Sequence, residues 1–158
     1  MADYFTYFSV VVPLRDAAQQ QYAVDLAAKA AGCCFRDEEA SIPDDIPPEL
    51  AHVLHEWHFE TEEQDKTGIW LHSQEGGVDA ACSFIQHLLK KFEPEGRVEF
   101  EWSHDCSKPR VEAYGGGAAV VTADKILTMS TSEWLRQQTD SLPEPKRGSH
   151  INKNTRQI

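Results

Sequence analysis

The chain has 158 residues, enough for one domain with its own hydrophobic core. Its 26 acidic residues outnumber 15 Lys and Arg, and the net charge of −11 weighs against direct nucleic-acid binding, because phosphates are held by clustered cations. No apolar run is long enough to cross a bilayer and no basic leader precedes an apolar segment, so we expect a cytoplasmic protein that does not contact membranes.

The negative charge is concentrated in one segment. Residues 37–65 hold eleven acidic residues and no Lys or Arg, while elsewhere fifteen acids balance fifteen bases. The stretch from Lys146 on is basic and contains no carboxylate. We predict a single α+β domain over residues 1–139, with the acidic segment inserted before its second strand, and a disordered basic tail over residues 140–158. A protein partner with a basic surface would suit the acidic segment.

The four cysteines do not suggest a disulfide framework. Cys33 and Cys34 are adjacent, and neither Cys82 nor Cys106 belongs to a C-x-x-C pair. In the absence of a secretion signal, we expect free thiols in a reducing compartment. We predict no cofactor.

The first two predicted elements are a strand and a helix. Residues 4–12 are rich in aromatic and β-branched side chains, and alternate residues can face a core. Asp16 is a suitable helix N-cap and Gly32 a suitable C-cap. Between them apolar residues recur every four positions, which predicts a helix; they are Ala18, Tyr22, Leu26 and Ala30.

A loop over residues 33–46 leads to a short predicted helix that starts at Pro47-Pro48. His52, His55 and His58 lie in it at intervals of three. His52 and His55 would share a face and are candidate metal ligands. No cysteine or carboxylate set completes four ligands, so solvated or capping histidines are the preferred interpretation.

Residues 59–64 and 68–74 predict a hairpin around a turn that ends in glycine. Trp70 and His72 would lie on the face opposite to the core, where aromatic side chains are typical of binding hot spots; cover by the C-terminal segment is the alternative. The first strand carries three acidic candidates for contact with a basic partner, Glu60, Glu62 and Glu63.

The clearest helix of the sequence follows Gly76-Gly77. Apolar residues continue through Phe92 at spacings of three and four, and Lys90 and Lys91 suit its C-terminal turn. Cys82 lies on this apolar stripe, so we predict a structural, buried thiol.

A strand follows, because Val98, Phe100 and Trp102 alternate with polar residues. Continued alternation would place His104 and Cys106 on the apolar face. Proline then breaks the strand, and residues 111–114 can start a returning strand. The next three residues, Gly115, Gly116 and Gly117, predict a bulge, a sharp bend or the close approach of another backbone.

Two interpretations fit this region. In one, His104 and Cys106 are base and nucleophile, and an anion is held by cationic side chains and glycine amides; the candidates are Lys108, Arg110, Gly115, Gly116 and Gly117. In the other, which we prefer, His104 and Cys106 are packed at a strand end beside a bend. The glycines match neither a Walker A loop nor a dinucleotide fingerprint, since no Gly-Lys-Ser/Thr follows and no helix opens there.

The run WSHDCSKPRVEAYGGGAAVVTAD, with the SEWL that follows it, resembles the C-terminal part of small uncharacterised proteins encoded by bacteriophages and other mobile elements. The shared features are Trp-Ser-x-x-Cys-Ser-x-Pro and Gly-Gly-Gly-Ala, over about the last third of the fold. The resemblance implies an intracellular, bacterial or phage context and implies no activity.

The remaining elements are a hairpin over residues 118–129, turning at Asp124-Lys125, and a short helix over residues 133–137. Thr131 or Ser132 would cap this helix, and Trp134 and Leu135 could dock from it. The element order predicts an α+β, ferredoxin-like βαββαβ antiparallel sheet with two covering helices, an inserted short helix and an appended C-terminal β-hairpin.

Three functions remain open. The first, which we favour, is a non-enzymatic phage or mobile-element factor that engages a host protein through its acidic patch and open sheet face. The second is a small enzyme that uses His104 and Cys106 near Arg110 and the glycines. The third is a structural, homodimerising domain.

Overall fold

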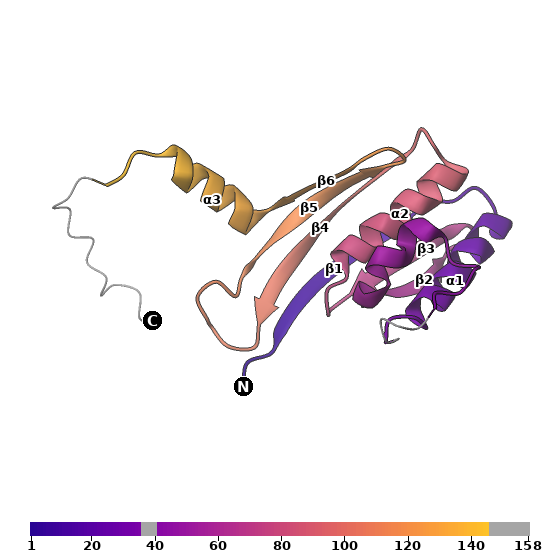
Figure 1. Ribbon diagram of the computed structural model, residues 1–158, viewed down its shortest axis with the longest axis horizontal. Helices are drawn as coiled ribbons and strands as arrows, with labels where there is room; N and C mark the ends of the chain where they lie inside the picture. The colour runs from indigo at the N-terminus through magenta and orange to yellow at the C-terminus, as the bar shows by residue number, and fades with distance from the viewer. Residues whose placement is uncertain (36–40, 146–158) are drawn as a thin grey trace.

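The computed structural model describes residues 1–35 and 41–145 (Figure 1). It confirms an α+β fold with an open, antiparallel sheet of six strands in the order β2-β3-β1-β4-β5-β6. The elements are β1 Tyr4–Val12, α1 Ala17–Ala31, the 3₁₀ helix η1 Pro48–Glu56, β2 Glu60–Gln64, β3 Gly68–Ser73, α2 Val78–Phe92, β4 Arg97–Cys106, β5 Gly115–Thr122, β6 Ile126–Ser130 and α3 Thr131–Ser141. Within this part of the chain, no helix combines the length and apolar character needed to span a membrane.

β1 is a central strand, with β3 on one side and β4 on the other, both antiparallel to it. Because every neighbouring pair is antiparallel, β1 and β2 run parallel with β3 between them, and β3 and β4 run parallel with β1 between them. α1 connects the first of these pairs and α2 the second. The predicted hairpin of β5 and β6 extends the sheet beside β4.

α1, η1 and α2 cover one face of the sheet and form the core with it (Figure 1). Asp16 caps α1 as predicted, accepting a hydrogen bond from the Gln19 amide at 2.8 Å. An aromatic cluster packs the link between η1 and β2 against α2 through Trp57, Phe59 and Phe84, with ring centroids 4.7–6.2 Å apart. The predicted strand and helix phases are confirmed, since the side chains expected in the core are buried there: Phe8, Val10, Val12, Ile69, Leu71, Cys82, Val98 and Phe100.

A buried histidine links the three covering helices. His87 on α2 has Nδ1 2.8 Å from a carboxylate oxygen of Glu49 on η1 and Nε2 2.7 Å from the hydroxyl of Tyr22 on α1. A carboxylate only accepts, so Nδ1 donates to Glu49, and in the neutral imidazole Nε2 accepts from Tyr22. The hydrogen bond from His87 lowers the pKa of Glu49, and burial raises the pKa of Tyr22.

The returning strand begins later than predicted. Residues 111–114 form a turn and not the start of a strand, with Glu112 at φ 66°, and β5 starts at Gly115. Of the three explanations for the glycines, close approach holds at Gly116 and Gly117. A Cβ on Gly116 would meet the backbone carbonyl of Trp102, whereas at Gly117 the approaching groups include a side chain. A Cβ on Gly117 would meet the indole of Trp102, its direct partner on β4, and the carbonyl oxygen of Met129 on β6.

The last helix is longer than predicted and starts two residues earlier, at Thr131 instead of position 133. α3 runs to Ser141, across the predicted domain boundary, and Ser130 is its N-cap, accepting from the Glu133 amide at 3.2 Å. No side chain of α3 is buried, and Trp134 and Leu135 are 50% and 59% exposed. The basic tail predicted beyond this helix lies outside the described residues from position 146 on.

We expect Gly117→Ala to lower the free energy of unfolding by roughly 1–3 kcal/mol or more, because overpacking against Trp102 and the β6 backbone forces the hairpin apart. Urea unfolding followed by circular dichroism measures this. The matched control is Gly32→Ala at the end of α1, where φ is −64° and a Cβ finds ordinary contacts, so the change should stay within about 1 kcal/mol. Equal effects at both positions would contradict the packing of Trp102 on Gly117.

We expect Glu49→Ala to lower the free energy of unfolding by about 1 kcal/mol at neutral pH, because His87 loses its hydrogen-bond acceptor. This is the low end of the range for an unpaired donor, since the Glu49 side chain is 45% exposed and water can take its place. The pKa of Glu49 is lower in the folded protein than its usual value of 4.5. Its contribution to the free energy of unfolding is therefore fully present above pH 4.5 and is lost as the pH falls through the pKa of the folded state. The difference between variant and wild type, measured by urea unfolding, should therefore shrink in acid. Glu49→Gln keeps an acceptor for His87 and should lose less. A difference that does not change with pH would contradict a hydrogen bond from His87 to the ionised carboxylate.

Candidate functional site

The sheet face opposite to α1, η1 and α2 is covered by no described helix, and it carries a stacked ring pair. Trp70 and His72 on β3 lie with ring centroids 4.1 Å apart and an interplanar angle of 31°. The indole N–H of Trp70 donates to Ser9 Oγ on β1 at 2.8 Å, which fixes the ring across the strand pair. The prediction that these two side chains face away from the core is confirmed, since both are only partly buried while Ile69 and Leu71 are fully buried.

Two carboxylates from β2 meet this ring pair. Glu60 is the direct cross-strand partner of His72, and Glu62 that of Trp70. His72 Nε2 lies 3.1 Å from Glu62 Oε1 and 3.9 Å from Glu60 Oε2, so all three potential ligand atoms lie within 4.8 Å of one another. The carboxylates remain 79% and 56% exposed. The cluster can therefore accept a cationic group from outside.

A second pair of carboxylates faces the same side from β4. Glu99 and Glu101 alternate with the buried Val98 and Phe100, and they border a shallow hollow of about 390 Å³ lined by small residues of β5. Glu99 is exposed but already pairs with Arg97 on the same strand, at 3.2 Å. We did not select these two glutamates from the sequence, although the alternation of β4 placed them opposite to the core. The sequence does not show that the acids of β4 and β2 lie on one face of the same sheet, because the order of the strands in the sheet differs from their order along the chain.

The described acids of the 37–65 segment do not gather in a single patch. Asp45 pairs with Lys29 of α1 at 2.8 Å, and this hydrogen bond lowers the pKa of Asp45. Glu49 is held by His87. Glu63 is exposed but follows Glu62 on the strand and so points to the other face. Only part of the segment thus contributes to the open face; acids 37–39 lie outside the described residues.

His104 and Cys106 share the strand end but differ in surroundings. Cys106 is 7% exposed and pairs with Tyr4 of β1, as expected for a packed thiol. His104 lies beyond the covering helices and is exposed, with Nδ1 2.9 Å from Thr6 Oγ1. Continued alternation placed it on the correct face, but the hydrophobic core does not extend that far. Within the described chain, no contact joins His104 to Cys106.

The candidate anion site is not assembled either. Lys108 and Arg110 are exposed in a tight turn closed by the Arg110 amide and the Lys108 carbonyl at 2.8 Å. The Gly116 amide donates to Thr131 Oγ1 at 3.0 Å, so it serves the start of α3. Gly115 takes φ +138°, and Gly117 lies under Trp102. These glycines are explained by the packing of the strand end.

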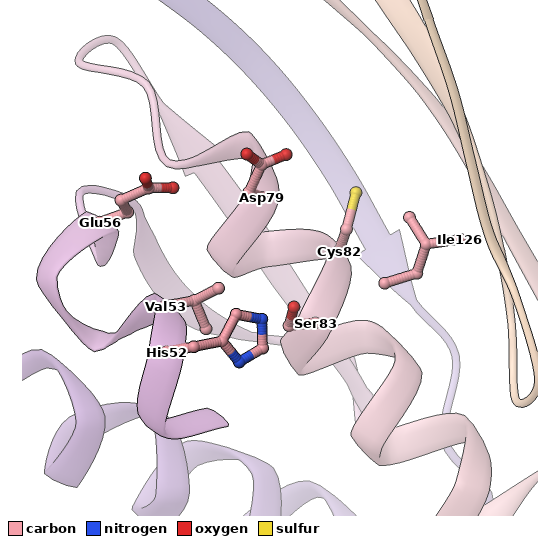
Figure 2. A pocket seen from close by; sticks show the side chains of 7 residues that line it. All are labelled: His52, Val53, Glu56, Asp79, Cys82, Ser83 and Ile126. Atoms are coloured by element: carbon pink, nitrogen blue, oxygen red, sulfur yellow. The ribbon is translucent and has the colours of Figure 1, made fainter. Parts of the chain in front are cut away.

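The metal candidates His52 and His55 lie apart from the open face. His55 Nε2 is 3.4 Å from its neighbour Glu56, and no third ligand converges on the pair in the described residues. His52 lines a groove of about 280 Å³ between η1, α2 and the start of β6 (Figure 2). Carboxylates of Glu56 and Asp79 lie at one end of this groove, and His52 and Ser83 at the other (Figure 2).

The groove also contains Cys82, whose environment suits packing and not catalysis. The residue is 1% exposed, and burial raises the pKa of its thiol to about 12. The thiolate is the reactive form of cysteine, so this side chain is protonated at neutral pH and is no nucleophile.

No family model matches the chain, and it likewise has no match among curated proteins or solved structures.

We expect Cys82 to resist alkylation in the folded protein. Iodoacetamide at mildly alkaline pH should modify Cys34, which is partly exposed, much faster than Cys82, and denaturation should remove the difference. Mass spectrometry of the labelled peptides measures both rates in one sample. Cys82→Ser should cost on the order of 1–3 kcal/mol, because it buries a hydroxyl without an assured partner. Rapid labelling of Cys82 in the native state would show that the face of α2 is assigned incorrectly.

Proposed function

We propose that this chain is a non-enzymatic binding protein that recognises a basic segment of a partner protein on its open sheet face. The observation that carries the proposal is the arrangement of exposed carboxylates from two non-adjacent strands, Glu60 and Glu62 on β2 and Glu99 and Glu101 on β4. β3 and β1 lie between them and present the fixed indole of Trp70.

Each part of this face has a use in binding a cation-bearing chain. Carboxylates attract Lys and Arg side chains over long range and orient them at short range. An indole face adds cation–π attraction and apolar contact area, worth roughly 0.5–1 kcal/mol at an exposed site. The hollow beside Glu99 and Glu101 has room for the end of a long side chain. Because strands hold all these groups, little ordering is needed on binding.

The enzyme interpretation has less support. A cysteine nucleophile needs a base within hydrogen-bond reach, and the ring of His104 is instead engaged by Thr6. Cys106 is buried against β1, and the amide of Gly116 is occupied. Nothing in the described part of the chain therefore favours this function over binding.

Fold and context complete the proposal. We propose that β1 to β4 with α1 and α2 form a ferredoxin-like unit, because each helix links two parallel strands across an intervening third. The resemblance of the segment around Trp102 and Cys106 to phage and mobile-element proteins supports an intracellular, bacterial or phage role, with a host protein as the partner. No direct contact with nucleic acid or membrane is part of this proposal.

We expect lysine- and arginine-rich peptides to bind the full chain with an affinity that falls as salt rises, because exposed charges are screened over about 8–10 Å near physiological ionic strength. Glu60→Gln with Glu62→Gln should weaken binding about 2- to 30-fold, since exposed ion pairs contribute roughly 0.2–1 kcal/mol each. Isothermal titration calorimetry measures both effects.

The control changes the same charge elsewhere: Glu95→Gln with Glu112→Gln removes two exposed carboxylates that lie in turns outside the open face. This variant should bind like the wild type at the same salt concentration. Equal weakening by both double variants would show that binding depends on net charge alone and not on the carboxylates of β2. Salt-independent binding would refute the proposed electrostatic recognition.

A further inference from the structure

The free edge of β6 lacks the usual protection of an edge strand. β6 is the last strand of the sheet, and no described element pairs with its outer side. Edge strands normally carry Lys, Pro or a bulge that blocks pairing with another chain. The strand ILTMS has none of these residues, and it exposes Leu127 and Met129 at 58% and 49%.

α3 follows β6 directly and exposes a second apolar surface. Trp134 and Leu135 are 50% and 59% exposed, and Leu142 just past the helix is 68% exposed. Leu135 and Leu142 are seven positions apart and so lie on one side. The helix stands away from the covering layer (Figure 1) and touches its own chain mainly at β5 and β6.

From these observations we propose that the β6–α3 segment, residues 126–142, joins two copies of this chain. A second copy is the proposed occupant because an unprotected, uncharged strand edge can pair with itself across a two-fold axis. Each copy carries a net charge of −11, so two copies repel one another unless they meet where charge is lowest. From Ile126 to Ser132 there is no charged residue, and the acidic β2 lies at the opposite edge of the sheet.

Antiparallel pairing of the two β6 edges gives a self-complementary contact. A two-fold axis through Thr128 places this residue opposite itself, a favourable threonine pair, and places Leu127 opposite Met129 of the second copy. Because the axis is normal to the sheet, both helical layers lie on the same side. The carboxylates of β2 lie at the edge of the sheet opposite to the contact, and β5 separates those of β4 from it, so the two open faces stay accessible.

The same register assigns an occupant to the groove of Figure 2. It places Ser130, the N-cap of α3, opposite Ile126 of the second copy, and Ile126 lines that groove. α3 therefore starts beside the groove of the other copy. The groove offers apolar atoms from Val53. α3 exposes Trp134 and Leu135 between its charged residues Glu133, Arg136 and Asp140, so the proposed contact of helix and groove rests on apolar surface and not on charge.

Sedimentation velocity of the full chain across the micromolar range tests the proposal, and we expect a monomer–dimer equilibrium. Leu127→Lys, at the β6 edge, should raise the dissociation constant at least tenfold, about 1.4 kcal/mol. The matched control is Val11→Lys, an equally apolar position, 45% exposed on the same sheet face but on the central strand β1. It should leave the equilibrium unchanged. Trp134→Ala should weaken the dimer roughly 30-fold, as expected for an aromatic hot spot.

Register is tested separately. Thr128→Cys should form a disulfide-linked dimer on mild oxidation, faster than the wild type with its four native cysteines, because position 128 faces itself across the axis. A chain that stays monomeric over the whole concentration range would overturn the proposal. So would a dimer that Val11→Lys disrupts and Leu127→Lys does not, since the open face would then be the interface. Circular dichroism confirms that each variant is folded before its result is interpreted.

Discussion

Two α-helices of fifteen residues and the 3₁₀ helix η1 have to cover a six-stranded sheet, and they are too short and too few to do so. A helix of this length spans roughly 22 Å, whereas the ten residues of β4 span roughly 33 Å. The core therefore ends near Phe100, and beyond it the strands stabilise one another by other means. Trp102 folds over Gly117, and Thr6 bonds to His104. The exposed His104 and the uncovered opposite face follow from the same shortage of helical cover.

The shortage also separates the two proposed contacts in space and in chemistry. The carboxylates of the open face lie on β2 and β4, where partner cations would be attracted, and the uncharged strand β6, followed by α3, lies at the edge opposite to β2. A partner held by charge and a second copy held by backbone pairing would respond to different conditions. Salt would weaken the first contact and strengthen the second, because it screens the repulsion between two copies that each carry a net charge of −11. In a dimer, two acidic faces would point the same way, which would raise the apparent affinity for a partner with two basic segments.

The local pattern of apolar residues was enough to predict the strands and helices, but not which other elements pack against them. The alternation around Phe100 and the spacing of apolar residues around Cys82 predicted strand, helix and buried faces correctly, because the period of each element is imposed by backbone geometry. The same alternation could not show that the helical layer stops before His104. Glu99 was not predicted as a site residue, because its position on the same face as the acids of β2 depends on the order of the strands in the sheet. That order is a long-range property. The turn at Glu112 requires a positive φ, which glutamate rarely adopts, so residue preferences could not predict this turn.

The position of β1 has a consequence for how the chain reaches this structure. Residues 4–12 are synthesised before their partners on β3 and β4, which extend to Cys106, about a hundred positions later. During synthesis β1 cannot pair until both β3 and β4 have been made, and until then Phe8 and Val10 are not buried. Contacts so distant in sequence slow folding, because a large loop must close before any pairing is gained. The nascent chain therefore passes through a period in which its most apolar strand is open to chaperones or to aggregation.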